Sequence, residues 1–184
     1  KARALTSIAL RPGWNLVSLP NDPASTLINE VVNVAAVDTV LTYDPTVSGG
    51  WLTAVRDAEG NLAGPLDTID SSRAYWIHTT TFQALKVDIP GMAGGAEALP
   101  PSFSLIKGWN LVPVVSLVSA VGTTIDADQY FSGLKWSRAY GYNSATRQFD
   151  ALIPTTTATP GRTDTVAVGS GYWIFLTESG DLIP

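Results

Sequence analysis

Apolar and polar residues alternate with a period of two in several short stretches of the chain. The stretch at residues 14–19 is followed by strand-like stretches at 37–43, 51–55, 74–78 and 85–89, with turn-forming residues between them. A period of two is typical of β-strands that are buried on one face. Further short stretches of this type occupy residues 103–106, 109–115, 135–142, 148–153 and 172–177. The pattern predicts a mainly β fold, arranged as a sandwich or a barrel.

Two short segments break this pattern and favour helices. Asp22 and Pro23 suit an N-cap and a first helical position, and the apolar residues at 27, 28, 31 and 32 have helical spacing. Residues 125–131 predict a second short helix. Gly13 suits the turn of a β-hairpin between residues 8–10 and 14–19, which would place the first helix after the second strand.

Three blocks of sequence occur twice. The block Gly13-Trp14-Asn15-Leu16-Val17 recurs at 108–112, displaced by 95 positions, which is the step from Trp14 to Trp109. Residues 67–69 and 75–77 recur at 164–166 and 172–174, each displaced by 97 positions, which is the step from Tyr75 to Tyr172. A displacement that the three blocks share to within two residues indicates a duplicated folding unit. We therefore predict two tandem copies of one fold, at 1–90 and 102–184, joined by a Gly- and Pro-rich linker at 91–101.

The recurring residues are mainly aromatic, aliphatic and amide side chains, which favours a structural role for them. We expect the two tryptophans after the glycine turns to be mostly buried, and the following asparagines to bond neighbouring loop backbone. Asp67 and Asp164 are expected to cap the turn before a strand. The predicted structural signature is Trp14, Asn15, Tyr75, Trp76, Trp109, Asn110, Tyr172 and Trp173.

Composition excludes several classes of protein. The net charge of −5 comes without any cluster of Lys or Arg, so no nucleic-acid footprint is present. No apolar run approaches the length of about 20 residues that spans a membrane, and no signal peptide is visible. The absence of cysteine and the low charged fraction of 15% suit an extracellular bacterial or archaeal surface, although an ordinary soluble protein has a similar composition.

Catalytic and metal-binding patterns are also missing, so we expect no catalytic, cofactor-binding or metal-binding residues. His78 is the single histidine, and no Gly-x-Ser-x-Gly motif accompanies it. The loop at 57–61 and the pair Asp126 and Asp128 offer oxygen ligands for calcium, but a solvated turn and a helix cap explain them better. Asp67 and Asp164 are the one acidic pair that the matched blocks share, which gives a glycosidase little support.

Two features are compatible with ligands or modification. Trp51 and Trp136 have no tryptophan partner in the other unit, so they are the candidates for an aromatic platform that binds sugars. The Thr-rich stretch at 155–160 is compatible with O-glycans on a surface protein, or with an ordinary exposed loop.

Residues 13–20 read Gly-Trp-Asn-Leu-Val-Ser-Leu-Pro, followed by Tyr43-Asp44-Pro45, Trp51 and residues 74–77. This pattern resembles the tandem β-rich modules of bacterial and archaeal surface proteins of the S-layer type. The resemblance covers nearly all of both units and implies a cell-surface context without catalysis. The second unit departs from the pattern where Val112 is followed by Pro113 and Val114, and where Phe149 replaces a tryptophan.

The sequence thus favours a non-enzymatic structural module of an extracellular layer or filament, with no cofactor. Its expected partners are copies of itself or the rest of a larger surface protein. Residues 1–7 either pair along a neighbour's open strand edge or form a disordered terminal arm. The alternatives are a polysaccharide-binding module that uses exposed tryptophan, and a virion surface or decoration protein.

Overall fold

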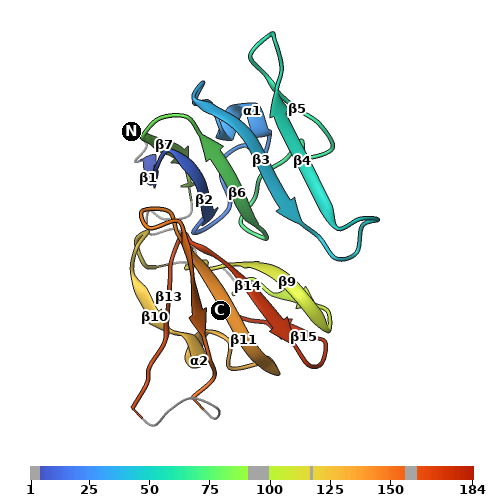
Figure 1. The fold of residues 1–184 in the computed structure, drawn as a ribbon, viewed down its shortest axis with the longest axis vertical. Helices are drawn as coiled ribbons and strands as arrows, with labels where there is room; N and C mark the ends of the chain where they lie inside the picture. The colour runs from blue at the N-terminus through green and yellow to red at the C-terminus, as the bar shows by residue number, and fades with distance from the viewer. Residues whose placement is uncertain (1–4, 91–99, 117, 156–160) are drawn as a thin grey trace.

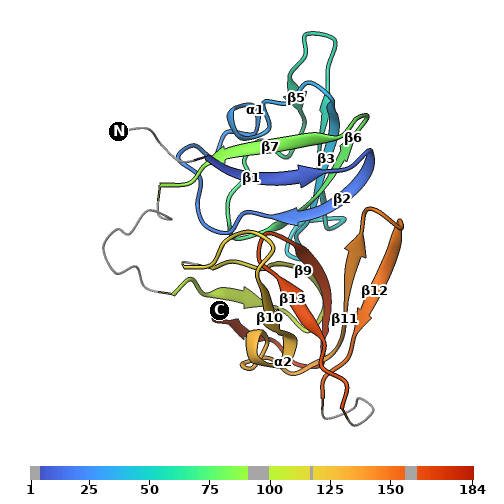
Figure 2. The same cartoon turned by 90° about the vertical axis from the view of Figure 1, so that its left-hand side faces the viewer.

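The chain folds into two β-rich units that are consecutive in sequence and stacked in space (Figures 1 and 2). The computed structural model describes residues 5–90, 100–116, 118–155 and 161–184. The first unit comprises β1 (Leu5–Leu10), β2 (Gly13–Ser18), α1 (Ile28–Val31), β3 (Val37–Tyr43), β4 (Trp51–Arg56), β5 (Leu62–Ala63), β6 (Ala74–Thr79) and β7 (Gln83–Asp88).

The second unit comprises β8 (Phe103–Leu105), β9 (Gly108–Pro113), β10 (Thr124–Asp126), α2 (Ala127–Tyr130), β11 (Trp136–Asn143), β12 (Gln148–Leu152), β13 (Thr165–Ala167), β14 (Gly171–Leu176) and β15 (Gly180–Leu182). All strand pairs within these elements are antiparallel, and each helix has four residues. The predicted mainly β fold with short helices is confirmed. No helix of the described segments is long and apolar enough to cross a membrane.

Strand order corresponds between the units. The main sheet of the first unit runs β2-β6-β3-β4-β5, and that of the second runs β9-β14-β11-β12. Val17 lies opposite Tyr75 in the first sheet, and Val112 lies opposite Tyr172 in the second. That the units are copies of one fold stays a prediction, for which superposition of 6–90 on 102–182 should bring Trp14 onto Trp109.

The predicted hairpin is wrong, because the two strands that flank Gly13 belong to different sheets. β1 pairs with β7, whereas β2 pairs with β6. The Asn15 side chain holds the turn between them, since its Oδ1 accepts from the Arg11 N–H at 2.9 Å and its Nδ2 donates to the Arg11 carbonyl at 2.8 Å. Asn110 bonds both backbone groups of Ile106 in the same way, so the role predicted for the two asparagines is confirmed.

Each unit has a core of its own. In the first unit, the main sheet contributes Val17, Val40 and Ile77, and the β1–β7 pair contributes Leu10 and Leu85 to the opposite side of the same buried cluster. A second cluster is built in the C-terminal unit around Phe131, Ile174 and Leu176, all completely buried. Two layers with apolar inner faces are the expected arrangement for strands of alternating polarity.

Both helices are shorter than predicted. α1 begins after Leu27 without a side-chain cap, and Asp22 instead accepts hydrogen bonds from the backbone and hydroxyl of Ser71. α2 is capped by Asp126, whose carboxylate accepts from the Gln129 N–H at 3.0 Å, so that cap is confirmed. Residues 125 and 126 lie in β10 rather than in a helix, because they pair with β13.

Residues 5–7 of the N-terminal segment belong to the fold itself. Leu5, Thr6 and Ser7 pair with Asp88, Val87 and Lys86 of the same chain, and pairing of residues 1–7 with a neighbour's strand edge stays a prediction. Residues 1–4 lie outside the described residues, as do 91–99 of the linker and 156–160 of the Thr-rich stretch.

Tyr130 makes the fold sensitive to high pH. Its hydroxyl donates to the Pro113 carbonyl and accepts from the Val115 N–H, both at 3.0 Å, and burial raises its pKa from 10.0 to about 12. The unfolded chain therefore releases this proton first as the pH rises above 10, which favours unfolding. We expect the free energy of unfolding to fall by about 1.4 kcal/mol at pH 11 through Tyr130 alone.

Urea unfolding at pH 8 and at pH 11 measures this effect. Burial also raises the pKa of Tyr75 and of Tyr172, so the intact protein should lose more stability than Tyr130 alone accounts for. The Tyr130→Phe variant keeps those two groups and should lose less stability than the intact protein between the two pH values. Equal losses in the two proteins would contradict the assignment to Tyr130.

Candidate functional site

Strands β6 and β14, each the second strand from one edge of its main sheet, carry two adjacent aromatic residues that point to opposite faces. Tyr75 is 1% exposed in the core of the first unit, and its hydroxyl accepts from the Asp70 N–H at 3.0 Å. Tyr172 is buried in the second core, and its hydroxyl accepts from the Ala167 N–H at 2.9 Å. Because side chains alternate along a strand, Trp76 and Trp173 lie on the other faces, away from these cores.

The two outer faces meet in a small apolar cluster. Its buried members are Leu16, Ala74 and Leu111, and Gly171 lies directly against the first two. A Cβ atom on Gly171 would come within 2.5 Å of the Ala74 Cβ atom and within 3.0 Å of a Leu16 methyl carbon. The absence of a side chain at this position therefore lets the sheets approach closely.

Hydrogen bonds across the same junction fix the position of one unit relative to the other. The fully buried Ser18 donates its N–H to the Gly169 carbonyl and its hydroxyl to the Ser170 carbonyl, both at 2.9 Å. The Ser18 hydroxyl oxygen also accepts from the Val114 N–H at 3.2 Å. A buried polar group is costly unless it is bonded, so these contacts favour one defined arrangement of the two units.

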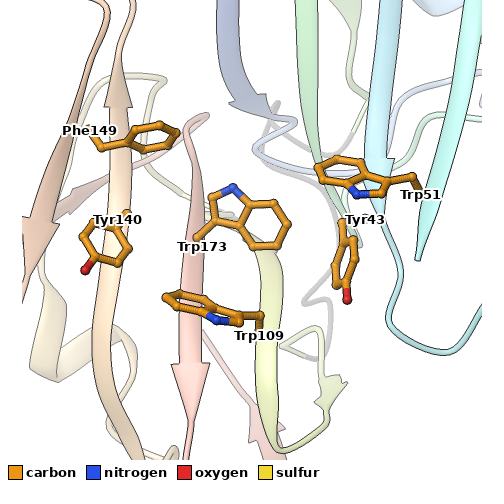
Figure 3. A pocket seen from close by; sticks show the side chains of 6 residues that line it. All are labelled: Tyr43, Trp51, Trp109, Tyr140, Phe149 and Trp173. Atoms are coloured by element: carbon orange, nitrogen blue, oxygen red, sulfur yellow. The ribbon is translucent and has the colours of Figure 1, made fainter. Parts of the chain in front are cut away.

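Beyond this cluster side chains of both units line an open hollow of about 520 Å³, which we call the aromatic groove (Figure 3). Its lining consists of Tyr43, Trp51, Trp109, Tyr140, Phe149 and Trp173. Trp173 stands between the side chains of the two units, with ring centres 5.2 Å from Tyr43, 5.7 Å from Trp51 and 6.4 Å from Trp109. These tilted and edge-on contacts are the geometry that aromatic pairs prefer.

A second hollow of about 390 Å³ adjoins the aromatic groove. It is lined by Trp14, Leu41, Trp51, Trp76, Tyr142, Phe149 and Trp173, so three residues belong to both hollows. Its aromatic contacts are similar to those of the groove. The ring centre of Trp76 lies 4.9 Å from that of Tyr142 and 5.9 Å from that of Phe149. The two hollows therefore form one continuous aromatic surface between the units.

Part of this surface is open to solvent. Trp51 is 45% exposed and Phe149 is 55% exposed, which is unusual for large apolar side chains. The indole N–H groups of Trp51, Trp109 and Trp173 and the hydroxyls of Tyr43 and Tyr140 bond to no other described residue. The surface that lines the groove is nevertheless almost entirely apolar.

No charged side chain lines the groove, although charged groups contact or neighbour two of its residues, Trp109 and Tyr43. The Arg138 guanidinium lies 5.5 Å from the ring centre of Trp109 and 5.3 Å from that of Phe175, within the range of cation–π contacts. Burial would raise the pKa of Asp44, but hydrogen bonds from Thr46 and the charge of Arg73 outweigh it and hold that pKa below its ordinary value. Asp44 therefore stays ionised and paired at neutral pH.

The structure corrects one prediction about the repeated tryptophans. Trp14 is 36% exposed, so the expectation that it is mostly buried is wrong, and Trp109 is half-buried. Both side chains lie on the outer faces, where Trp14 lines the second hollow and Trp109 lines the groove. The sequence could not assign the face, because alternation alone does not say which side of a sheet meets its own core.

The two tryptophans predicted as a sugar-binding platform lie in different environments. Trp51 stands in both hollows, opposite Tyr43 on the neighbouring strand. Trp136 is half-buried against the core of the second unit, with its ring centre 5.4 Å from that of Phe131, and it belongs to neither hollow. Of the pair, only Trp51 is brought to the aromatic surface.

The polar residues considered for catalysis or calcium binding are each occupied by a contact within their own unit. His78 Nδ1 lies 2.8 Å from an Asp38 carboxylate oxygen, and the imidazole stands beside the Trp14 ring. The Asp57 carboxylate accepts from the Asn61 N–H within its own loop, while Asp128 accepts from Thr155. Within the described ranges, no three His, Cys, Asp or Glu side chains gather as a metal site would require.

The matched acids, Asp67 and Asp164, share one backbone contact. The Asp67 carbonyl accepts from the Ile28 N–H at the start of α1, and the Asp164 carbonyl accepts from the Ala127 N–H at the start of α2, both at 2.9 Å. The Asp164 carboxylate also accepts from the Ile153 N–H and from Arg162. Each aspartate therefore joins a loop to the helix of its own unit.

Sequence reasoning did not identify Tyr43, Tyr140, Phe149 and Trp173 as members of a common site. A usable signal was present in the adjacent aromatics of β6 and β14, because a strand with large apolar residues at consecutive positions is covered on both faces. The partner covering the second face came from the other unit, which no local pattern reveals.

The chain matches no family model, no curated protein and no solved structure. The resemblance to surface modules therefore remains an expectation from the residues, and a functional hypothesis depends on the geometry of the aromatic surface.

Proposed function

We propose that this chain is a non-enzymatic structural module of an extracellular surface layer or filament, which holds a neighbouring polypeptide through its aromatic groove. The observation that carries the proposal is the exposed aromatic surface between the units, centred on Trp51 and Phe149. A continuous exposed apolar surface marks an interaction site in soluble proteins. Tryptophan and tyrosine are also the residues that dominate binding energy at interfaces.

The make-up of the groove supports a role in binding. Its six lining side chains are all aromatic, and tyrosine hydroxyls are their only titratable groups. Acid–base or nucleophilic catalysis needs groups that exchange protons or attack near neutral pH. A low charged fraction of 15% adds support for assembly, because little charge repulsion opposes close packing of neighbours.

The second candidate is a module that binds polysaccharide, and one observation favours it. Trp51, the platform candidate from the sequence, is exposed at the edge of the groove, where a pyranose ring could stack on the indole. A virion surface protein would use the same aromatic surface for assembly. Electron microscopy of the native source would separate a lattice, a filament and a particle from a monomer.

A paired substitution tests the proposed role of the groove. Trp51→Ser with Phe149→Ser removes the two most exposed rings of the aromatic groove, and we expect association of the protein to weaken about tenfold or more. Sedimentation velocity over a range of concentrations, with the rest of the native surface material added, measures this association. Both positions are exposed, so the thermal midpoint should change little.

Phe82→Ser is the matched control, since Phe82 is 60% exposed and lines neither hollow. This variant should associate as the intact protein does. If the paired variant associates as well as the control, or if the intact protein stays monomeric at high concentration with its native material, the proposal is wrong.

A further inference from the structure

We infer that the aromatic groove binds a quaternary ammonium group, as found in choline and related N-methylated cations. This inference goes beyond the proposed function, because it concerns a small cationic ligand rather than a neighbouring polypeptide, although both would occupy the same surface. The rings that line the groove, its apolar character and a cation that already contacts one of the rings all support it.

All six side chains that line the groove are aromatic, and no aliphatic side chain accompanies them. The face of an aromatic ring carries partial negative charge, so it attracts a cation as well as apolar groups. The ring of Trp173 is inclined by 56° to that of Tyr43 and by 72° to that of Trp51, and Figure 3 shows the other rings arranged around it. Rings at such steep angles form the walls of a box, which is how proteins bind quaternary ammonium ligands.

The lining leaves few hydrogen-bonding partners for a ligand. Its surface is almost entirely apolar, and no carboxylate, carboxamide or imidazole belongs to it. An ammonium group with N–H donors would lose its hydrogen bonds to water without replacement, and the same holds for the hydroxyls of a sugar. A fully methylated ammonium group has no N–H, so it loses no such bond when it enters. The groove therefore favours a methylated cation over an unmethylated one.

One ring of the groove already contacts a cation of the chain itself. The Arg138 guanidinium lies 5.5 Å from the ring centre of Trp109 and 5.3 Å from that of Phe175. Neither Arg138 nor Phe175 belongs to the lining, so this cation lies beside the groove and leaves the hollow open. The contact places positive charge within cation–π range of a lining ring, and a bound ammonium group would use the remaining rings in the same way.

Charge and size agree with such a ligand. The protein has a net charge of −5 and no charged side chain in the lining, so its overall field attracts a cation and repels an anion. The hollow of about 520 Å³ lies within the usual range of small-molecule pockets, and the exposed rings of Trp51 and Phe149 leave it accessible from solvent. A neutral apolar ligand could fill the same space, but it would gain nothing from the net charge or from the negative ring faces.

Calorimetry with a matched pair of ligands tests the inference. The pair is choline and its neutral carbon isostere, in which a tert-butyl group replaces the trimethylammonium group. The two ligands have nearly the same size and differ in charge, so a site that selects only by apolar contact would bind them equally. We expect choline to bind the intact protein about tenfold or more tightly than the isostere. The N-methyl proton resonances of choline should also move upfield, because ring currents shield groups held over aromatic faces.

Variants of Trp51 locate the binding. Trp51→Leu keeps apolar contact and removes the ring, so the affinity for choline should fall about tenfold. Trp51→Phe keeps a ring and should retain more of that affinity than Trp51→Leu does. Phe82→Leu is the matched control, because Phe82 is exposed and lines neither hollow, and it should bind choline as the intact protein does. Circular dichroism and thermal melting of each variant confirm that the fold is kept.

Vesicles of phosphatidylcholine present the same group on a membrane and distinguish the two sources of this ligand. Sedimentation of the protein with these vesicles, reversed by choline, would identify a lipid headgroup. Binding of choline without such sedimentation would identify a free ligand.

The outcomes also separate this inference from the proposed function. Equal binding of choline and its isostere, or binding of choline that Trp51→Leu leaves unchanged, would overturn the inference. A protein that associates through the groove but does not bind choline would overturn the inference and leave the structural role standing. A protein that binds choline but stays monomeric would support the inference and contradict the structural role, and failure of both measurements would overturn both.

Discussion

Leu111→Asp is expected to lower the free energy of unfolding by about 3–5 kcal/mol and to separate the two units. Leu111 is 6% exposed in the cluster with Leu16 and Ala74, where the sheets of the two units meet. A carboxylate there loses its water without gaining a partner, since the cluster is apolar. The carboxylate can be hydrated again only if the two units move apart at this junction.

Urea unfolding and small-angle scattering together measure the effect. Opening of the junction should enlarge the radius of gyration, and two unfolding transitions should replace one if each unit keeps its own core. Ile183→Asp is the control, because Ile183 is 61% exposed, and its stability should change by less than about 0.5 kcal/mol. A Leu111→Asp protein as stable and compact as this control would contradict the contact between the units.

Asn15→Ala is expected to cost about 2–4 kcal/mol, and Asn110→Ala should cost a similar amount. Asn15 is 3% exposed and Asn110 is 2% exposed, and each side chain bonds both backbone groups of the residue four positions before it. Truncation removes the partners of those N–H and carbonyl groups at the point where the chain passes from one sheet to another. Each group left unbonded costs about 1–3 kcal/mol if it stays buried.

Chemical unfolding of both variants measures this cost, with Asn61→Ala as the matched control. Asn61 is exposed, and the hydrogen bonds in its loop use its backbone N–H and carbonyl. The stability of the Asn61→Ala protein should therefore be nearly unchanged. Losses below about 0.5 kcal/mol in both Asn15→Ala and Asn110→Ala would show that the amides do not hold the turns.

The sequence was sufficient to predict most strands and the role of the repeated asparagines. Strands are recognised from alternation, which is a local property, and an amide next to a glycine turn has backbone groups within reach whatever the rest of the chain does. The boundaries of the short helices were harder to predict. Asp22 has the form of an N-cap, yet its carboxylate bonds Ser71 from a distant part of the chain.

Pairing of strands depended on contacts between distant residues. The turn at Gly13 looks like a hairpin, but β1 and β2 pair with β7 and β6, each more than 50 positions away along the chain. Each of these pairings buries apolar residues in a core that both partners build, and that gain exceeds the advantage of a short connection. Local sequence contains no measure of that gain.

The sequence by itself determined that two strands carry aromatic residues on both faces, since Tyr75-Trp76 and Tyr172-Trp173 are adjacent in strands of period two. Only the tertiary structure decided which ring enters a core and which faces the other unit. Close approach at Gly171 and the bonds of Ser18 set the distance between the sheets, and that distance leaves Trp51 and Phe149 at an open groove. Exposure of a side chain depends on what packs against it, and here the packing partner lies in the other half of the chain.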